Sequence, residues 1–280
     1  MMITKDKDVA IASEKVGVSR IFVDLEKNGK AQRQPGDTVK SDHTIEDVKE
    51  ISKVLTESSL LVRINPIFHG SKSEIEQVLE CNPDYVMLPF FKTYEEISQF
   101  INFVEGRAKT ILLFETKESI ERIDEILSID GIDEAYIGLN DLHMSYGKEF
   151  MFELLVDGTV SEITKKFKAH GLPFGFGGIG NINGKAAVSP EKILCAHYYF
   201  ESQSVILSRT FSNNKKLDIP LEQYLTLEIE KIRKYEAIFS NFTLEEFEDN
   251  QKQLAEEVSK FVRGTLTCLF SLLALYHISM

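Results

Sequence analysis

The sequence has few of the features that mark several classes of protein. It has only three cysteines, widely spaced, in 280 residues. They form neither a disulfide framework nor a zinc ribbon, so we expect a reducing, cytoplasmic compartment. It has no cluster of basic residues and a net charge of −12, which argues against nucleic acid as a partner. Its first twelve residues, MMITKDKDVAIA, contain no apolar stretch fit for a signal peptide.

The C-terminus is the exception to this ordinary composition. Residues 266–278 are almost wholly apolar, yet this run is shorter than the roughly 20 residues that span a bilayer. It could be a helix buried against the rest of the protein or a partner subunit. It could instead be a membrane-associated tail, or a terminus foreign to the parent fold. Apart from this tail, we expect no membrane partner.

Short apolar runs recur along the chain, and a helical pattern follows most of them. Alternation of this kind predicts parallel strands linked by helices. The strand candidates are 1–4, 20–26, 59–65, 84–90, 109–115, 133–139, 172–178 and 202–208. The helical patterns include 6–16, 117–127 and about 148–168. Another begins at Ser71, and a capping box, Thr93 with Glu96, opens a further one.

Eight such units in about 215 residues favour an α/β fold of the (β/α)8 TIM-barrel type. An open flavodoxin-like or Rossmann sheet is the rival, but the glycine-rich segment 175–180 lacks the dinucleotide fingerprint. We expect a catalytic barrel over 1–217 and a helical extension over 218–263, with helices at 221–239 and 243–262. The apolar tail then occupies 264–280.

Polar residues collect at the ends of these strands, where the active sites of parallel barrels lie. They are Asp24, Glu26, Arg63, Asn65, Glu115, Asn140, Asp141, Gly177, Gly178, Ser208 and Arg209. Glu115 and Asp141 follow neighbouring strands, so their carboxylates would meet at one rim. Two such carboxylates can bind one hard divalent cation, with water and substrate completing its shell.

Each of these residues also has a purely structural interpretation. Glu115 could be a carboxylate favoured at a helix N-terminus, and Asp141 could cap the next helix. Arg63 could form an ion pair across the rim. The glycines could mark a tight turn, and His43 could be a loop residue near a helix start.

Four segments together resemble a known family. They are VRINP (62–66), MLPFFKTYEE (87–96), LLFETKESI (112–120) and GIDEAYIGLNDLHMSYG (131–147). In this order and spacing they resemble the HpcH/HpaI 2-oxoacid aldolase and citrate lyase β-subunit family. The resemblance covers residues 2–210 and leaves out the last 60 or so.

The resemblance implies a phosphoenolpyruvate/pyruvate-binding barrel that holds Mg²⁺ or Mn²⁺ through Glu115 and Asp141. Arg63 would bind the carboxylate or enolate oxygen of a pyruvate-like group, and amides near Asn140 and Asp141 would bind its other end. Gly177 and Gly178 would line the same substrate site. The family's habit of assembling, with the extra helices here, makes a homo-oligomer the expectation.

The sequence departs from the family pattern where acid and base groups are expected. Leu113 replaces the glutamine that precedes the metal glutamate in the aldolase branch, and the Glu-His after strand 2 is missing. Asp24-Leu25-Glu26 matches the citrate lyase branch, but Lys27 replaces its second acid. Glu26, Arg33 and His43 are therefore the candidate acid–base residues. The loop 27–43 is long enough to be a substrate lid.

Three functions follow from these observations. The first is a Mg²⁺-dependent carbon–carbon lyase, or aldolase, acting on a 2-oxo or hydroxy acid with release of an aldehyde and a pyruvate-type enolate. The second is a thioester lyase of the citryl- or malyl-CoA kind. The third is a barrel that binds metal and oxoacid without turnover.

Overall fold

The strands close into a single cylinder in which all neighbours run parallel. The structure, a computed structural model, describes residues 1–29, 42–184, 186–212 and 219–277. Each strand pairs with the next in chain order, and the first and last pair through Met2 and Leu207. The strands are β1 Met2–Ile3, β2 Arg20–Asp24, β3 Ser59–Arg63, β4 Tyr85–Leu88, β5 Lys109–Phe114, β6 Glu134–Ile137, β7 Phe174–Ile179 and β8 Ser204–Leu207. The (β/α)8 barrel is confirmed, and the open sheet is excluded.

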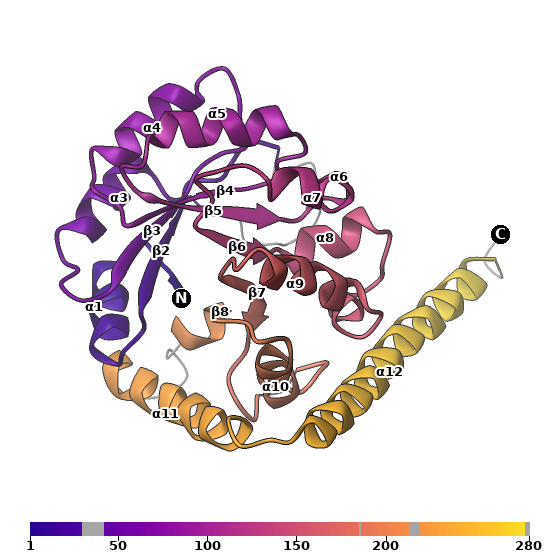
Figure 1. Cartoon of the computed structure of the whole chain (residues 1–280). Coiled ribbons are helices and arrows are strands. Elements are labelled where there is room, and N and C mark those ends of the chain that lie inside the picture. The colour runs from indigo at the N-terminus through magenta and orange to yellow at the C-terminus, as the bar shows by residue number, and fades with distance from the viewer. Residues whose placement is uncertain (30–41, 185, 213–218, 278–280) are drawn as a thin grey trace.

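Helices surround this cylinder (Figure 1). They are α1 Lys7–Lys15, α3 Ile45–Ser52, α4 Ser71–Leu79, α5 Tyr94–Val104, α6 Lys117–Glu121, α7 Ile123–Ile126, α8 Leu139–Ser145, α9 Thr159–Ala169, α10 Pro190–Phe200, α11 Leu221–Phe239 and α12 Leu244–His277, with 3-10 turns η1 Met151–Leu155 and η2 Arg209–Ser212. The capping box is confirmed: the Thr93 hydroxyl accepts from the Glu96 amide, and the Glu96 carboxylate accepts from the Thr93 amide.

Side chains alternate between the inside and the outside of the barrel, as the two-residue period of a strand requires. In β5, Ile111 and Leu113 pack inside the cylinder, while Leu112 and Phe114 pack outward under the helices. The inner cluster is completed by Met1, Phe22, Leu61, Met87 and Tyr136. Glu115 is the next inward position after Leu113, so β5 directs this carboxylate toward the end of the cylinder.

Several expected boundaries are wrong. The strands predicted over 20–26, 59–65 and 84–90 each end two residues earlier, and the helix predicted over 243–262 continues to His277. The helix predicted over 117–127 breaks at Arg122, whose backbone (φ −105°, ψ 13°) leaves the helical region and separates α6 from α7. The helix predicted over 148–168 consists of η1 and α9, separated at Gly158 with φ +95°. The strand predicted over 133–139 stops at Ile137, because α8 already begins at Leu139.

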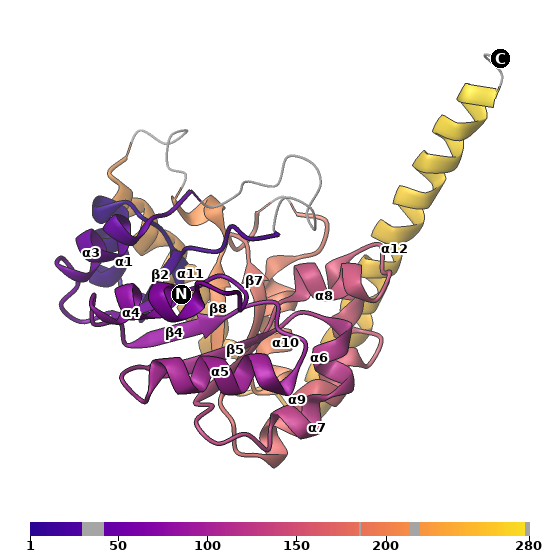
Figure 2. The ribbon, with the colours of Figure 1, turned by 90° about the horizontal axis from the view of Figure 1, so that it is seen from above.

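The C-terminal helices α11 and α12 lie outside the eightfold unit. Glu257 of α12 accepts hydrogen bonds from the Ser189 amide (2.8 Å) and the Lys192 ammonium (2.9 Å) at the start of α10. The Phe261 ring lies 4.3 Å from that of Phe150. Beyond this contact α12 continues unbroken to His277 and projects away from the barrel (Figures 1 and 2). Among the described residues, no helix is both long and apolar enough to cross a membrane.

The buried imidazole of His197 predicts a loss of stability in acid. It is 4 % exposed and stacked on the Phe176 ring at 3.8 Å, and burial lowers its pKa to about 3. Between that value and the ordinary pKa of about 6.5, only the unfolded chain binds the proton. The free energy of unfolding should therefore fall by about 1.4 kcal/mol for each pH unit below 6.5, and should be insensitive to this group above it.

Urea unfolding at several pH values tests this expectation. His197→Phe should reduce the number of protons taken up on unfolding below pH 6.5 by about one, and so flatten the pH dependence of the unfolding free energy. His170→Phe, at an exposed position, should leave that dependence unchanged. An identical slope in His197→Phe and the parent would contradict the assignment.

Candidate functional site

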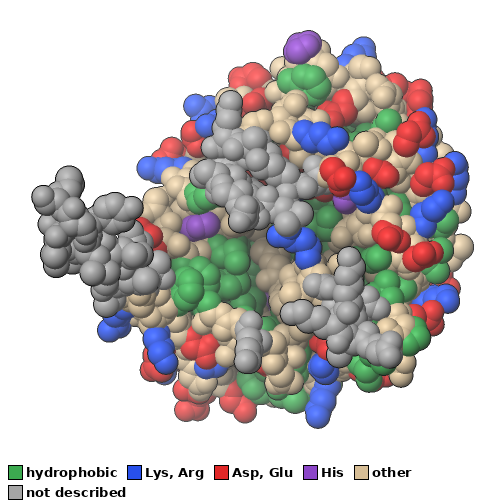
Figure 3. All heavy atoms as spheres, turned by 180° about the vertical axis from the view of Figure 1, so that it is seen from behind, with side chains coloured by type: hydrophobic (Ala, Val, Ile, Leu, Met, Phe, Trp, Pro, Cys, Tyr) green, Lys and Arg blue, Asp and Glu red, His purple; other side chains and the backbone are tan. Residues whose placement is uncertain are grey.

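The end of the barrel at which the strands finish is a hollow in the molecular surface. Figure 3 shows this face, with apolar side chains on one wall of the depression. Asp24 and Arg63 end β2 and β3, lie two residues after the inward Phe22 and Leu61, and pair across the sheet. Alternation therefore places both on the inside of the barrel, as it does Glu115. These polar side chains at the mouth therefore lie directly above the apolar side chains that fill the inside of the barrel.

Arg63 is held by two buried carboxylates. Its Nε and Nη2 donate to Oδ1 and Oδ2 of Asp24 at 2.8 Å each, and Nη2 lies 3.3 Å from Oε2 of Glu26. Asp24 is 4 % exposed and Glu26 2 %. Burial alone lowers the pKa of the guanidinium, but Asp24 and Glu26, with a contribution from Glu115, outweigh it and raise that pKa above its usual range. The ion pair at the rim, which the structural interpretation of Arg63 predicted, is therefore present.

His43 is hydrogen-bonded to the end of β2. Its Nδ1 accepts a hydrogen bond from the Asp24 amide at 3.0 Å, so the neutral imidazole carries its proton on Nε2. Burial lowers the pKa of His43, although Asp24 and Asp47 oppose the shift. Three of the predicted residues, Glu26, His43 and Arg63, are thus brought together. Arg33 and most of the predicted lid 27–43 lie outside the described residues.

Glu115 lies buried at the mouth, fixed by its neighbours. The Phe90 amide donates to its Oε1 at 3.0 Å. Phe90 has φ +50°, a left-handed conformation that costs a non-glycine residue about 1–2 kcal/mol. Strain of this kind collects at functional sites. Capping of α6 falls to Thr116, whose hydroxyl accepts from the Ser119 amide, so helix capping does not explain Glu115.

Gly138 leaves the space that Glu115 occupies. A Cβ on Gly138 would lie 2.7 Å from Oε2 and 2.8 Å from Cβ of Glu115, closer than real contacts allow. The same Cβ would lie 3.2 Å from Leu113. The backbone of Gly138, directly after β6, therefore lies against the Glu115 carboxylate with no side chain between them.

Asn140 and Asp141 lie in the first turn of α8. Gly138 is the N-cap of that helix and has no side-chain cap, so Asp141 is an internal helical residue and does not cap α8. Asp141 is half-buried and Asn140 is exposed. The chain therefore turns from β6 into α8 at Gly138, whose backbone lies against Glu115.

Gly177 and Gly178 lie in the last part of β7. Gly177 has φ +51°, and a Cβ there would lie 2.7 Å from Cδ1 of Leu139. Its carbonyl accepts from the buried Tyr136 hydroxyl at 2.7 Å. Packing therefore explains the glycine at 177, and a part in ligand binding stays a prediction.

Two residues of this site, Gly138 and Phe90, were not selected as candidates from the sequence. Asp24 was selected as a polar residue at a strand end, but no role was assigned to it. Gly138 was detectable as a glycine directly after a strand. Phe90 gives no sequence signal, because its contribution is a backbone amide.

The fold is a closed (β/α)8 barrel, and its mouth carries a buried arginine–carboxylate cluster and a further buried glutamate, Glu115. The sequence matches the model of the HpcH/HpaI aldolase/citrate lyase family over residues 14–172. The chain belongs to this family and is accordingly a barrel of the aldolase and citrate lyase type. None of the curated proteins matches the sequence.

Solved structures of low sequence identity share the fold. An HpcH/HpaI aldolase from Desulfitobacterium hafniense DCB-2 is 15 % identical, with a TM-score of 0.59 over 78 % of this chain and 92 % of its own. RipC from Yersinia pestis is 15 % identical, with a TM-score of 0.55 over 88 % and 95 %. The citrate synthase SbnG is 16 % identical, with a TM-score of 0.56 over 74 % and 84 %.

Proposed function

We propose that the protein is a divalent-metal-dependent carbon–carbon lyase that cleaves or forms a 2-oxo or hydroxy acid through a pyruvate-type enolate. The observation that carries the proposal is Glu115. It is a buried carboxylate on an apolar strand of a family barrel, with Oε1 held by the Phe90 amide and Oε2 facing the bare backbone of Gly138. A carboxylate held in such a place supplies the kind of oxygen ligand that a hard divalent cation prefers.

The donor set suits Mg²⁺ or Mn²⁺. Within the described part of the chain no group of three or more His, Cys, Asp or Glu is placed to hold a metal ion. Mg²⁺, however, is commonly bound by one or two carboxylates, with water and substrate as its other ligands. Glu115 and Asp141 would hold it. When bound, the ion supplies Lewis acidity at the 2-oxo carbonyl, where negative charge develops as the carbon–carbon bond breaks.

Arg63 would bind the substrate carboxylate through the part of its guanidinium that Asp24 leaves open. Asp24 occupies the Nε and Nη2 edge, and among the described residues no acceptor bonds Nη1. The two carboxylates fix the orientation of the guanidinium, so its charge is already aimed when substrate arrives.

The hydrogen-bonding state of His43 limits its role. Because Nδ1 already accepts from Asp24, His43 presents Nε2–H and acts as a donor to the oxygen of the aldehyde partner. In the cleavage direction the hydroxyl proton needs an acceptor, and Glu26 is the remaining described candidate for it.

A second candidate function is a barrel that binds metal and oxoacid without turnover. The observation that favours it is the bidentate Arg63–Asp24 pair, because the edge of the guanidinium best suited to a carboxylate is already occupied.

Proton exchange of pyruvate separates the two. We would incubate the protein with pyruvate in D₂O, with Mg²⁺, Mn²⁺ or EDTA, and follow the methyl signal by proton NMR. Metal-dependent loss of the signal supports the lyase. Demonstrable metal binding with no exchange favours the binding barrel or a thioester substrate.

Gly138→Ala should impair metal binding while the barrel stays folded. The added methyl must displace the Glu115 carboxylate, which cannot keep both its contact with Phe90 and its position. We expect Mn²⁺ affinity, measured by water proton relaxation, to fall about tenfold, and overpacking to cost about 1–3 kcal/mol of stability. Gly264→Ala, where an added Cβ meets nothing, is the matched control. Unchanged Mn²⁺ affinity in Gly138→Ala would count against Glu115 as a ligand.

We also propose that the protein is a homo-oligomer that uses the projecting part of α12. Removal of residues 265–280, beyond the Phe261 contact with the barrel, should lower the mass measured by light scattering after size exclusion to that of fewer subunits. The circular dichroism spectrum should lose only the helical signal of the removed part of α12. The same mass with and without these residues would assign assembly to another surface.

A further inference from the structure

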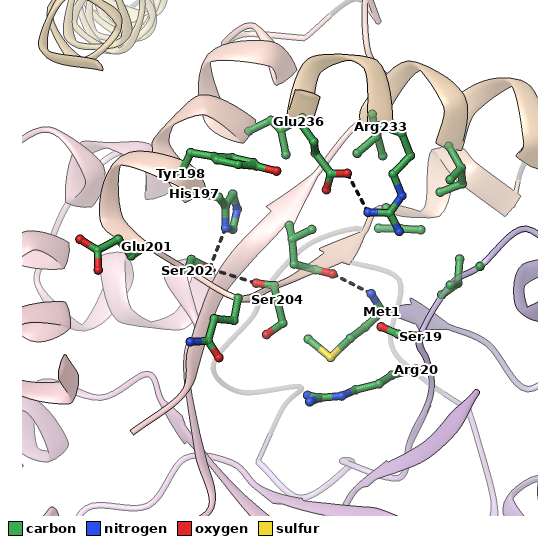
Figure 4. Close-up of a pocket in the computed structure, with 18 residues that line it drawn as sticks. Met1, Ser19, Arg20, His197, Tyr198, Glu201, Ser202, Ser204, Arg233 and Glu236 are labelled. Carbon is green, nitrogen blue, oxygen red and sulfur yellow. Dashed lines mark hydrogen bonds and ion pairs between the residues drawn. The ribbon is translucent and has the colours of Figure 1, made fainter. Parts of the chain in front are cut away.

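A second cavity, of about 470 Å³, lies at the opposite end of the barrel from the proposed active site. It is reached where strands begin, at Arg20 of β2 and Ser204 of β8, and α10 and α11 cover its sides (Figure 4). Its volume lies within the range of small-molecule sites. Its described lining contains none of Asp24, Glu26, Arg63, Glu115 and Asp141.

The walls combine an apolar surface with a charged end. Ile229 and Ile232 of α11 and Leu194 of α10 are buried apolar residues of the lining. Arg20 and Arg233 provide its positive charge, and Figure 4 shows them on either side of Met1. A ligand with an apolar chain and a charged group would therefore contact the apolar wall with its chain and the arginines with its charged group.

Each arginine is anchored at one nitrogen. Nη1 of Arg20 donates to Glu134 at 2.7 Å, and its guanidinium lies 4.1 Å over the Tyr85 ring. Nη1 of Arg233 donates to Glu236 at 2.7 Å, one helical turn away. The Arg233 side chain is 62 % exposed. A pair of this kind contributes little to stability, so Arg233 can exchange Glu236 for another carboxylate at small cost.

The charged groups around the cavity are of both signs. Its lining also includes Glu201 and Glu236, which pair with Lys168 and Arg233. Burial and then the charges of Arg20 and Arg233 lower the pKa of the Met1 amino group to about 5, while Glu134 opposes the shift. Burial disfavours a charge of either sign at this point, and the two guanidinium groups make an anion less unfavourable there than a cation.

We propose that this cavity is a second binding site, for a small organic carboxylate with an apolar chain. The carboxylate lies against the guanidinium of Arg233, with Arg20 contributing longer-range attraction, and the chain packs against Ile229, Ile232 and Leu194. The planar fork of arginine matches a carboxylate, and the long apolar wall selects against a bare inorganic anion. This site is independent of the proposed lyase activity.

Hexanoate, hexan-1-ol and hexylamine are the probes, because they share a chain and differ in charge. Binding to the full chain would be measured by saturation-transfer NMR and calorimetry with EDTA present, so that no metal site contributes. Hexanoate should bind saturably, and the alcohol and amine at least about tenfold more weakly, or about 1.4 kcal/mol.

Arg233→Gln and Arg122→Gln form a matched pair of variants. Arg122 also pairs with a glutamate three residues on, Glu125, at an exposed position remote from the cavity. Arg233→Gln should weaken hexanoate at least tenfold and Arg122→Gln should not, with both variants melting like the parent. Equal hexanoate binding by parent and Arg233→Gln would overturn the proposal. So would equal binding of hexylamine and hexanoate, or no saturable hexanoate binding.

Discussion

Glu115→Gln should abolish metal-dependent exchange of the pyruvate methyl protons in D₂O. The substitution preserves the size of the side chain but removes the negative charge that would bind the ion. Loss of an outer partner of a metal ligand already costs 10–100-fold in activity or affinity, so loss of the ligand should cost at least about 100-fold. The rate would be followed by proton NMR at saturating Mn²⁺.

The control for this variant is Glu118→Gln. Glu118 lies three residues on, is half-buried and pairs with Lys92 at 2.8 Å. It should exchange pyruvate protons at the parent rate. Equal exchange rates in Glu115→Gln and the parent would remove Glu115 from the reaction, whatever the effect on stability.

Arg63→Gln should destabilise the protein by about 3–5 kcal/mol, because it leaves Asp24 and Glu26 buried without their cation. The free energy of unfolding would be measured by urea titration. Arg107→Gln is the comparison: Arg107 also makes a bidentate pair, with Glu76, but at the surface. We expect its loss to cost less than about 1 kcal/mol.

Arg63→Lys separates stability from chemistry. The lysine keeps the charge but not the planar fork, so much of the stability should return while pyruvate exchange stays low. Full exchange in Arg63→Lys would show that the arginine serves the fold alone. A cost for Arg63→Gln similar to that for Arg107→Gln would show that the buried cluster is not a structural unit.

Much of this fold could be predicted because each strand is a continuous apolar run ended by polar residues. That pattern predicted all eight strands and put Glu115 and Arg63 at the ends of two of them. The α6/α7 break could not be predicted, because nothing in the sequence forbids helical geometry at Arg122.

Other parts of the site depend on contacts between segments distant in sequence. The Asp24–Arg63 bond depends on strand register, and the position of His43 on the chain that follows β2. The Phe90 amide contributes through a backbone conformation that a phenylalanine rarely adopts. No local pattern encodes any of these.

The apolar middle layer of the barrel separates the charged groups at its two ends with a region of low dielectric constant. Arg20 and Asp24 belong to the same strand, about 13 Å apart at 3.3 Å per residue. Between them lie the buried side chains of Phe22, Leu61, Met87, Ile111 and Tyr136. At an effective dielectric constant of 20, a unit charge gained beside Arg20 would change the electrostatic energy of a unit charge beside Asp24 by about 1 kcal/mol.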